Sequence, residues 1–404
     1  MIVYPRKRFD FKYIDLLIAL GYCLNPLLDR NQIGYSIKKL WPNGNVLIGL
    51  SVRTIFDALL SELNFQRGSE VIMTGINIPD MVNIVQTHDL KVVPIDLDMS
   101  TLQIKPGVIE QSLSDRTVMV VVGHLFGSKM EMDIVYEALA NRPEIIIVED
   151  SAQAFQGVSQ HLPHPRTAIS MFSFGSIKSV SALGCSVALT LDHNLYKKLE
   201  SRLKDYNKSS RIKFMSKIIK YFFLKTLSFP FFYGMYIFFC RLFRIDYDAL
   251  IISAVRNFKL SDLFRLIRQS PCTSQLQFLK YRLSTMNKNH LLGRINAGNF
   301  VRERLNRDSN IHGLFNETHT YWLFPIKSKN KQELVSKLRS NGFDATFNSS
   351  QLNPIEATGE NQLTPNECIT YMGNTVYLPV YESIPEKKFD TLISIVNQTA
   401  DFQK

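Results

Sequence analysis

From Asn45 to about Thr190, short runs of apolar residues alternate with amphipathic stretches. The runs NVLIGL, SEVIMTG, KVVPIDL, TVMVVVGHL and EIIIVED are rich in β-branched residues, which is typical of buried strands. Between them, TIFDALLSEL, DMVNIVQTHD and EMDIVYEALAN carry apolar residues at helical spacing. This alternation predicts an α/β fold with a mostly parallel sheet that is flanked by helices on both faces.

The carboxyl ends of the predicted strands carry polar residues. In an open parallel sheet, ligands bind beyond these ends. The residues there are Ser51, Thr74, His124, Glu149 and Asp150. We expect His124 to be a structural histidine near the wall of the site, and we look for the chemistry among the others.

The pattern changes from about residue 310. THTYWLFPIK and NTVYLPVY read as strands, and KNKQELVSKLRSNGFDA and PEKKFDTLISIVNQTA read as helices, which predicts a smaller C-terminal α+β domain. We therefore divide the chain into an N-terminal arm or amphipathic helix (1–40), a large α/β domain (41–210), an insert (211–265), and a helical connection with the small domain (266–404).

Composition narrows the class of protein. With 45% hydrophobic and 21% charged residues, the 404-residue chain is globular in composition. Its five cysteines are scattered without a C-x-x-C pair, which argues against a disulfide framework and favours a reducing, cytoplasmic setting. The two histidines of HLPH (161–164) have no further ligands nearby in the sequence, so we expect no metal.

The net charge of +11 has a local origin. Seven basic residues and no acidic one fall between Arg211 and Ile245, so the charge belongs to one segment and we expect no nucleic-acid partner. The same segment holds twelve aromatic residues. An apolar stripe at helical spacing is predicted from five of its residues, with lysines on another face: Met215, Ile218, Ile219, Phe222 and Phe223 against Lys213, Lys217 and Lys220.

Pro230 and Gly234 break this helix, and the apolar run from Leu227 to Cys240 has only 14 residues, whereas a membrane span needs about 20. A basic amphipathic helix followed by a broken apolar segment predicts a peripheral contact of residues 211–245 with the inner face of the cytoplasmic membrane. The alternative is that the insert folds onto the protein or packs across a dimer interface.

One lysine stands among small and apolar residues in MFSFGSIKSVSALG. A buried amine is costly unless it is needed as a reactive group. The strand that ends in Asp150 precedes Lys178 by about thirty residues, and an aspartate there can pair with a protonated pyridine nitrogen. Ser173 and the start of the helix near Ser51 can bind a phosphate. Together these are the parts of a pyridoxal phosphate site.

The order of these motifs resembles the DegT/DnrJ/StrS family of sugar aminotransferases. EDSAQA and FSFGSIK look like the family's acidic pair and lysine segment, and RGSEVIMTGINIPD, VVPIDLDMSTLQI, GHLFGSKMEMD and VYLPVYESIPEKKFD look like other family segments in the right order. The resemblance covers roughly residues 40 to 400, interrupted near 210 to 265. It implies a fold type I, pyridoxal phosphate-dependent transaminase.

The resemblance also implies roles. Lys178 would join the cofactor aldehyde and shuttle the proton, Asp150 would pair with the pyridine nitrogen, Gln153 would pack on the ring or bind its phenolic oxygen, and Ser173 would bind the phosphate. Glutamate would be the amino donor and a nucleotide-linked keto sugar the acceptor, in the synthesis of surface polysaccharide. Such enzymes build the site at a dimer interface, so a homodimer is expected.

Several positions depart from the family. Its Ser-Gly-Thr turn reads SVRT, so either Arg53 binds the phosphate, or Arg53 points to solvent and Ser51 or Thr54 does so. Ile78 occupies the place of an aromatic residue, and Ser270 that of an asparagine brought by the partner subunit.

Three rival functions remain. The first keeps the cofactor but uses a lipid-linked keto acceptor. The second is a dehydration, which in the family accompanies a histidine in place of the lysine, so Lys178 argues against it. The third is a catalytically silent scaffold that is tethered to the membrane.

Overall fold

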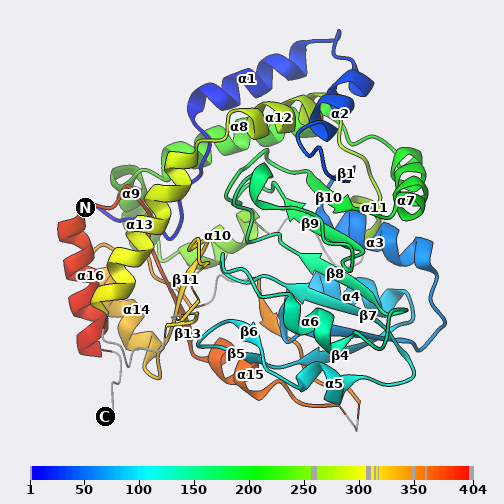
Figure 1. The fold of residues 1–404 in the computed structure, drawn as a ribbon. Coiled ribbons are helices and arrows are strands. Elements are labelled where there is room, and N and C mark those ends of the chain that lie inside the picture. Colours follow the sequence, from blue (N-terminus) through cyan, green and yellow to red (C-terminus); the bar gives the residue numbers. More distant parts are fainter. Residues whose placement is uncertain are drawn as a thin grey trace.

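The computed structural model describes residues 2–255, 262–305, 311–313, 315–316, 318–347, 351–359 and 362–399. Its centre is a seven-stranded sheet of order β1-β10-β9-β8-β7-β2-β4 (Figure 1). Only β10 runs against its neighbours. The strands are β1 (Asn45–Gly49), β2 (Glu70–Thr74), β4 (Lys91–Ile95), β7 (Thr117–Gly123), β8 (Ile146–Asp150), β9 (Ile169–Ser173) and β10 (Ser186–Thr190). The predicted mostly parallel sheet is confirmed.

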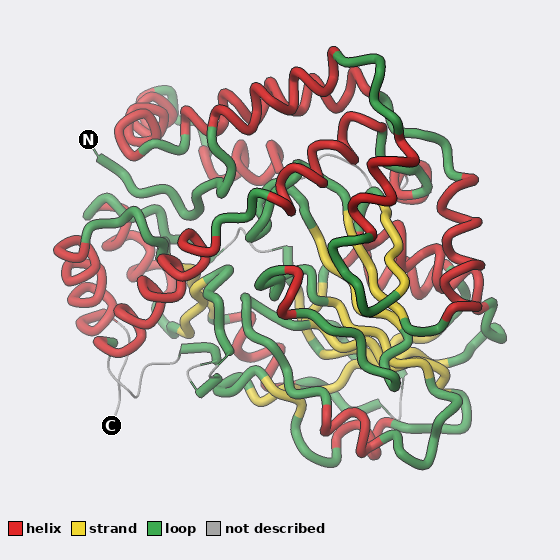
Figure 2. Tube along the Cα trace, turned by 45° about the horizontal axis from the view of Figure 1, so that its top comes forward, coloured by secondary structure: helices red, strands yellow, loops and turns green. Residues whose placement is uncertain are grey.

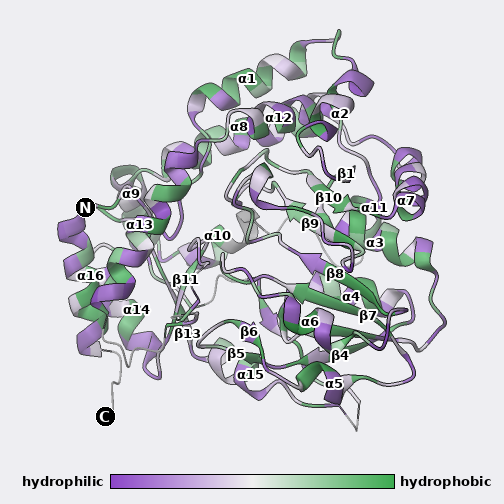
Figure 3. Cartoon of the chain, viewed as in Figure 1, coloured by the Kyte–Doolittle hydropathy of each residue, from purple (hydrophilic) through white to green (hydrophobic). Residues whose placement is uncertain are grey.

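Helices cover both faces of this sheet. In β7, Met119 and Val121 join the core under α3 and α4, whereas Val120 and Val122 join the core on the opposite face with α6. Figure 3 shows the hydrophobic character of these central strands. The covering helices are α3 (Val52–Leu63), α4 (Pro79–Thr87), α7 (His193–Asp205) and α11 (Leu263–Ile267) on one face, and α5 (Val108–Ser112), α6 (Asp133–Ala138) and α15 (Asn366–Gly373) on the other.

The C-terminal part forms its own α+β layer. β11 (Phe324–Lys327) pairs antiparallel with β13 (Thr375–Leu378). They share a core with α13 (Lys288–Arg304), α14 (Lys331–Ser340) and α16 (Glu386–Thr399). Short pieces complete the strands: β3 (Ile76–Asn77) pairs with β12 (Asn353–Pro354), and β5 (Leu97–Asp98) pairs with β6 (Gln103–Ile104).

The N-terminal arm and the insert pack on each other. Helices α1 (Tyr13–Leu24), α8 (Arg211–Leu227) and α12 (Thr273–Ser284) lie side by side, with α2 (Arg30–Lys38) against α12 (Figures 1 and 2). Phe11 and Leu16 of the arm share one hydrophobic core with Phe214 and Ile218 of α8 and with Cys185 of the large domain. The arm and the start of the insert are therefore part of the body.

The predicted stripe of α8 is only partly correct. Its buried face consists of Phe214, Ile218, Tyr221 and Lys225, while Ile219 and Phe223 are 45% and 67% exposed. Because α8 is apolar around most of its circumference, periodicity did not identify which face the other helices would cover. Lys217, which was predicted to lie on another face than the apolar stripe, is half-buried.

The second half of the insert is less covered. α9 (Pro230–Leu242) is followed by α10 (Tyr247–Val255), and residues 256–261 lie outside the described residues. In the described part of the chain, no single helix is long and apolar enough to cross a membrane, although α8 and α9 together, bent by 91°, meet the length and composition required. Many large apolar side chains of this region are exposed, among them Phe231, Phe232, Phe238, Phe239 and Phe243.

Candidate active site

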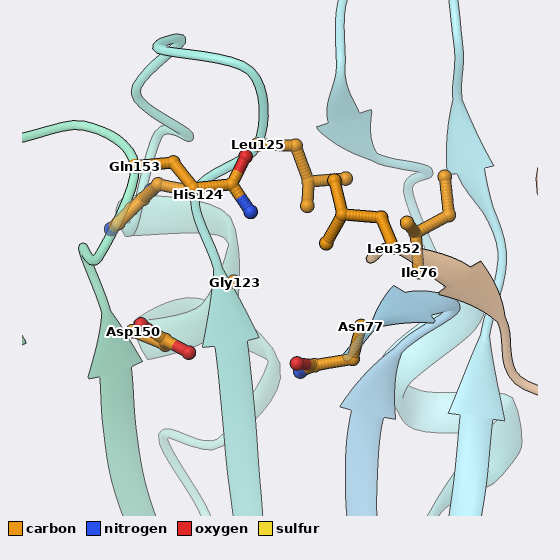
Figure 4. A pocket seen from close by; sticks show the side chains of 8 residues that line it. All are labelled: Ile76, Asn77, Gly123, His124, Leu125, Asp150, Gln153 and Leu352. Atoms are coloured by element: carbon orange, nitrogen blue, oxygen red, sulfur yellow. The ribbon is translucent and has the colours of Figure 1, made fainter. Parts of the chain in front are cut away.

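A pocket opens at the carboxyl edge of the sheet, where β7 and β8 end (Figure 4). It has about 210 Å³ of empty space, part of it open to solvent. The residues that line it are Ile76, Asn77, Gly123, His124, Leu125, Asp150, Gln153 and Leu352. The pocket thus lies at the carboxyl edge of the sheet, where the sequence predicted the chemistry.

Asp150 stands at the floor of this pocket as the last residue of β8. One carboxylate oxygen accepts a hydrogen bond from the backbone N–H of Ala152 at 3.0 Å, and the other accepts none from the residues that the structure describes. Burial raises the pKa of Asp150, opposed by this hydrogen bond and by the charge of Lys178. A cation placed in the pocket would therefore satisfy a carboxylate that is short of partners.

Two amides point into the same space. The backbone N–H of Phe126 donates to Oε1 of Gln153 at 2.8 Å, so the NH₂ group of Gln153 faces the pocket (Figure 4). Oδ1 of Asn77 accepts from the backbone N–H of Ile78 at 2.8 Å. The buried Nδ2 of Asn77 has no hydrogen-bond partner within the described ranges. Both amides thus present donors to whatever occupies the pocket.

His124 is held at both ring nitrogens, as expected of a structural histidine. Its Nδ1 accepts from the backbone N–H of Met130 at 3.0 Å, so Nε2 carries the hydrogen that reaches Glu149 at 3.2 Å. Burial raises the pKa of Glu149, but the hydrogen bonds from His124 and Thr167 outweigh it and lower the pKa. Glu149 is therefore an anchor for His124 and is not free for catalysis.

Lys178 lies in the loop that joins β9 to β10, half-buried. Burial lowers the pKa of its amine to about 8; the charge of Asp150 opposes this shift and that of Arg53 adds to it. The Nζ atom lies 4.4 Å from the ring centre of Trp322. A large fraction of this amine is neutral near pH 8, as a nucleophile requires.

The turn SVRT begins α3. Ser51 caps the helix by accepting from the backbone N–H of Thr54 at 3.2 Å, and the N–H groups of the first turn point toward the carboxyl edge of the sheet. Arg53 forms an ion pair with Asp80. The guanidinium therefore does not point freely to solvent, whereas the binding of a phosphate by Arg53 stays a prediction.

Thr54 needs a correction. It is fully buried, and its hydroxyl donates to the carbonyl of Ile267 at 2.8 Å. The side chain therefore fastens the segment before α12 to α3, and its predicted role as a phosphate ligand is wrong for this structure.

Ser173 ends β9, and its partner across the ladder is Ser186 of β10. Residues paired in this way place their side chains on the same face of the sheet. The fully buried hydroxyl of Ser186 has no hydrogen-bond partner within the described residues. We did not predict Ser186, although the register implied by Ser173 would have pointed to it.

Lys217 is a second residue that the sequence did not reveal. It comes from α8 in the insert and reaches the loop before β10, where its Nζ atom lies 4.0 Å from the point that a side chain on Gly184 would occupy. The next residue, Cys185, donates its backbone N–H to the carbonyl of Leu50 at 3.0 Å, just before the SVRT turn. Burial lowers the pKa of Lys217 to about 8, and Lys220 and Arg53 lower it further.

The two other departures are structural. Ile78 is half-buried and packs in the hydrophobic core beside the pocket. Ser270 is buried, and its hydroxyl donates to the carbonyl of Tyr206 at 3.2 Å within its own chain.

The residues fit pyridoxal phosphate. A carboxylate faces the pocket where a pyridinium can lie, and an unpaired amide donor and a lysine amine with a lowered pKa are close to it. Beside them are a helix start and buried hydroxyls and cations suited to a phosphate.

Comparison with known proteins agrees with this chemistry. Residues 54–218 match the sequence model of the DegT/DnrJ/EryC1/StrS aminotransferase family. Among solved structures, the aminotransferase TlmJ from Streptoalloteichus hindustanus has a TM-score of 0.70 at 14% identity, covering 99% of this chain and 98% of that one. PseC of Helicobacter pylori, an aminotransferase of pseudoaminic acid biosynthesis, has a TM-score of 0.70 at 13% identity and 99% coverage of both chains.

A third relative is the GDP-4-keto-6-deoxy-D-mannose-3-dehydratase of E. coli with bound hydrated PLP, with a TM-score of 0.68 at 13% identity, covering 98% of this chain and 99% of that one. The predicted resemblance and fold type are confirmed by these matches, and the predicted enzyme class and cofactor are those of the matched proteins. The segment that holds Lys178, Asp150 and most of the pocket therefore carries the sequence pattern of the DegT/DnrJ/EryC1/StrS aminotransferase family.

Proposed function

We propose that this protein is a pyridoxal phosphate-dependent aminotransferase that moves an amino group from glutamate to a nucleotide-linked keto sugar. The observation that carries the proposal is the pairing of Lys178, with its lowered pKa, and the under-satisfied carboxylate of Asp150 at one edge of the sheet. Surface polysaccharide synthesis is the proposed setting, by analogy with relatives that act on keto sugars and in pseudoaminic acid biosynthesis.

When bound, the cofactor supplies an electron sink that stabilises a carbanion at the substrate carbon. Asp150 would hold a proton at the pyridine nitrogen and so keep the ring cationic. Gln153 would donate its NH₂ to the phenolic oxygen, beside Nδ2 of Asn77, which has no partner among the described residues. Lys178 would hold the cofactor at its aldehyde, and its free amine would move the proton at the substrate carbon.

For the phosphate, we propose the first turn of α3 with Ser51, together with Ser173. Ser186 and Lys217 complete this cradle from β10 and from the insert. A dianion is favoured there because the charge of Arg53 acts on both Lys178 and Lys217, and neither lysine forms an ion pair among the described residues.

We further propose that residues 211–245 touch a membrane surface, which places the enzyme at the inner face of the cytoplasmic membrane. Four phenylalanines of α9 are each exposed by 46% or more: Phe231, Phe232, Phe238 and Phe239. Two exposed basic residues lie in or just after the same helix, Arg241 and Arg244. Exposed aromatic side chains beside cations suit an interface with anionic headgroups. Flotation with anionic liposomes tests this contact, and gel filtration tests the expected homodimer. If altering α9 abolishes the dimer but leaves flotation unchanged, the exposed surface of α9 belongs to the interface with the partner subunit.

The apolar surface also supports one alternative acceptor, a keto compound carried on a lipid. Saturation by a water-soluble nucleotide-linked keto sugar, with no gain on adding liposomes, would exclude it. The silent scaffold has less support, because an inert relative would have no need of a lysine amine with a lowered pKa.

The deciding experiment is the visible absorption spectrum of the purified protein with added pyridoxal phosphate, before and after glutamate. We expect a band of lysine-bound cofactor that glutamate converts to the band of the aminated cofactor. A band that ignores glutamate would reject the donor, and no band at all would reject the proposed function.

A further inference from the structure

Two lysine amines lie against the indole ring of Trp322, and an arginine lies close to them. Nζ of Lys7, from the N-terminal arm, lies 3.8 Å from the ring centre, and Nζ of Lys178 lies 4.4 Å from the same centre. The ring is fixed to the lysine loop, since its Nε1 donates to the carbonyl of Ile177 at 2.9 Å. Lys7 also donates to the carbonyl of Trp322 at 3.1 Å.

Arg294 of α13 is the third cation. It is 8% exposed, and its Nη2 donates to the hydroxyl of Ser179, the residue after Lys178, at 3.0 Å. Its Nε donates to the carbonyl of Thr320 at 2.8 Å. Within the described residues its Nη1 hydrogens make no hydrogen bond, so two donors of a fixed guanidinium remain for a ligand.

The nearby acids are already engaged. Asp10 receives hydrogen bonds from Arg282 at 2.5 Å and from the backbone N–H of Ser181 at 3.1 Å. Glu382 pairs with His290 at 3.3 Å. Burial lowers the pKa of Lys7, with Arg294 and Lys178 adding to the effect, and burial lowers the pKa of Arg294 to about 10. A bound carboxylate would relieve the mutual repulsion of Lys7, Arg294 and Lys178 and so favour their charged forms.

We propose that Lys7, Arg294 and Trp322 form the binding site for the carboxylate of the amino donor. The inference rests on the proposed function. The α-carboxylate of an amino acid is attached to the carbon that bears its nitrogen, and that nitrogen must take the place of the Lys178 amine. A carboxylate so placed must lie within a few ångströms of Lys178, where Lys7 and Arg294 offer charge-assisted hydrogen bonds and the indole face packs on the carbon chain.

Trp322 allows a direct test, because the chain has only two tryptophans. In the full-length holoenzyme with Trp41→Phe, the fluorescence of Trp322 is followed while glutarate, a dicarboxylate without an amine, is added. We expect saturable quenching, and Lys7→Gln should raise the dissociation constant about tenfold. Lys39→Gln is the matched control, since Lys39 stacks on exposed Tyr35 at 4.6 Å and should leave the constant unchanged.

A second variant guards against misfolding: Arg294→Lys keeps the charge and should weaken glutarate less than Arg294→Gln. Equal glutarate constants for Lys7→Gln and Lys39→Gln would overturn the proposal. So would a Lys7→Gln variant that loses affinity for pyrophosphate but not for glutarate, because the site would then belong to the phosphates of the sugar carrier. If the Trp41→Phe protein without further changes binds no cofactor, the proposed function itself is overturned. Cofactor binding is read separately, from the absorption band of the bound cofactor.

Discussion

The pocket and the insert leave opposite kinds of groups without partners. At the pocket, buried polar atoms such as Nδ2 of Asn77 and the hydroxyl of Ser186 find no hydrogen bond in the described part of the chain. On α9, Phe238 and Phe239 are about half exposed to water. A buried polar group without a partner and an exposed apolar surface both raise the free energy of the folded chain. The two regions therefore suit different kinds of ligand, a polar one at the pocket and an apolar one on α9.

The largest effect should come from the polar region. Lys178→Ala removes the amine that binds the aldehyde and moves the proton, so transamination should fall by about 10³-fold or more. The readout is the glutamate half-reaction, together with the absorption of the bound cofactor, which should lose its lysine-dependent band. A Lys178→Ala variant with an unchanged spectrum and rate would end the assignment of Lys178 and leave the pocket without its reactive group.

The apolar region should respond next. Changing Phe238 and Phe239 to serine removes two side chains that each contribute about 1.5–3 kcal/mol when buried, so partition onto anionic liposomes should fall on the order of 100-fold. Leu162→Ser with Leu363→Ser is the matched control, because these residues are 70% and 44% exposed in other parts of the chain. If the two double variants float equally with liposomes, α9 has no special affinity for lipid.

The rate at which Lys178 captures the cofactor should depend on pH. The pKa of Lys178 is lowered from 10.5 to about 8, so the neutral amine predominates above that pH and decreases about tenfold per unit below it. Capture of pyridoxal phosphate by the apoprotein, followed by stopped-flow absorption, should accelerate up to about pH 8 and then level off. Asp150→Asn removes a charge that raises this pKa, so its curve should shift to lower pH. A rate that keeps rising toward pH 10 would indicate an ordinary lysine.

The smallest effect should come from Lys217, which links the insert to the pocket region. Lys217 belongs to the insert but reaches the proposed phosphate cradle, so Lys217→Gln should weaken pyridoxal phosphate binding about tenfold without changing flotation. The readout is cofactor affinity by equilibrium absorption. Lys213→Gln, an exposed position on the same helix, should leave it unchanged. Equal affinities would mean that the insert and the cofactor site are independent.

The strands and the reactive lysine were predictable because they depend on short stretches of sequence. Continuous β-branched runs such as TVMVVVGHL read as buried parallel strands, and Asp150 ends one of them. Lys178 lies five residues after Ser173, in a region where β9 and β10 were not among the predicted strands. The structure thereby brings Asp150, Gln153 and Lys178 together at one edge, as the order of motifs implied.

The remaining site residues depend on packing between distant segments. Lys217 reaches the loop at Gly184 from the insert, and Trp322 reaches Lys178 from the C-terminal domain. No local sequence pattern predicts such contacts. The error for Thr54 has the same origin, because Ile267, which accepts its hydrogen bond, is more than two hundred residues away. Which face of α8 is covered was likewise decided by α1 and α12, not by the helix itself.

The reversed direction of β10 has a consequence for how the lysine is tethered. Since β9 and β10 are antiparallel neighbours, the chain leaves the sheet and re-enters it at the same edge, and the whole connection of residues 174–185 stays there. A parallel strand in that place would need a crossover to the opposite edge and back. The lysine loop is thus fixed to the sheet at both of its ends, so later segments of the chain can lengthen or diverge while the amine stays at this edge of the sheet.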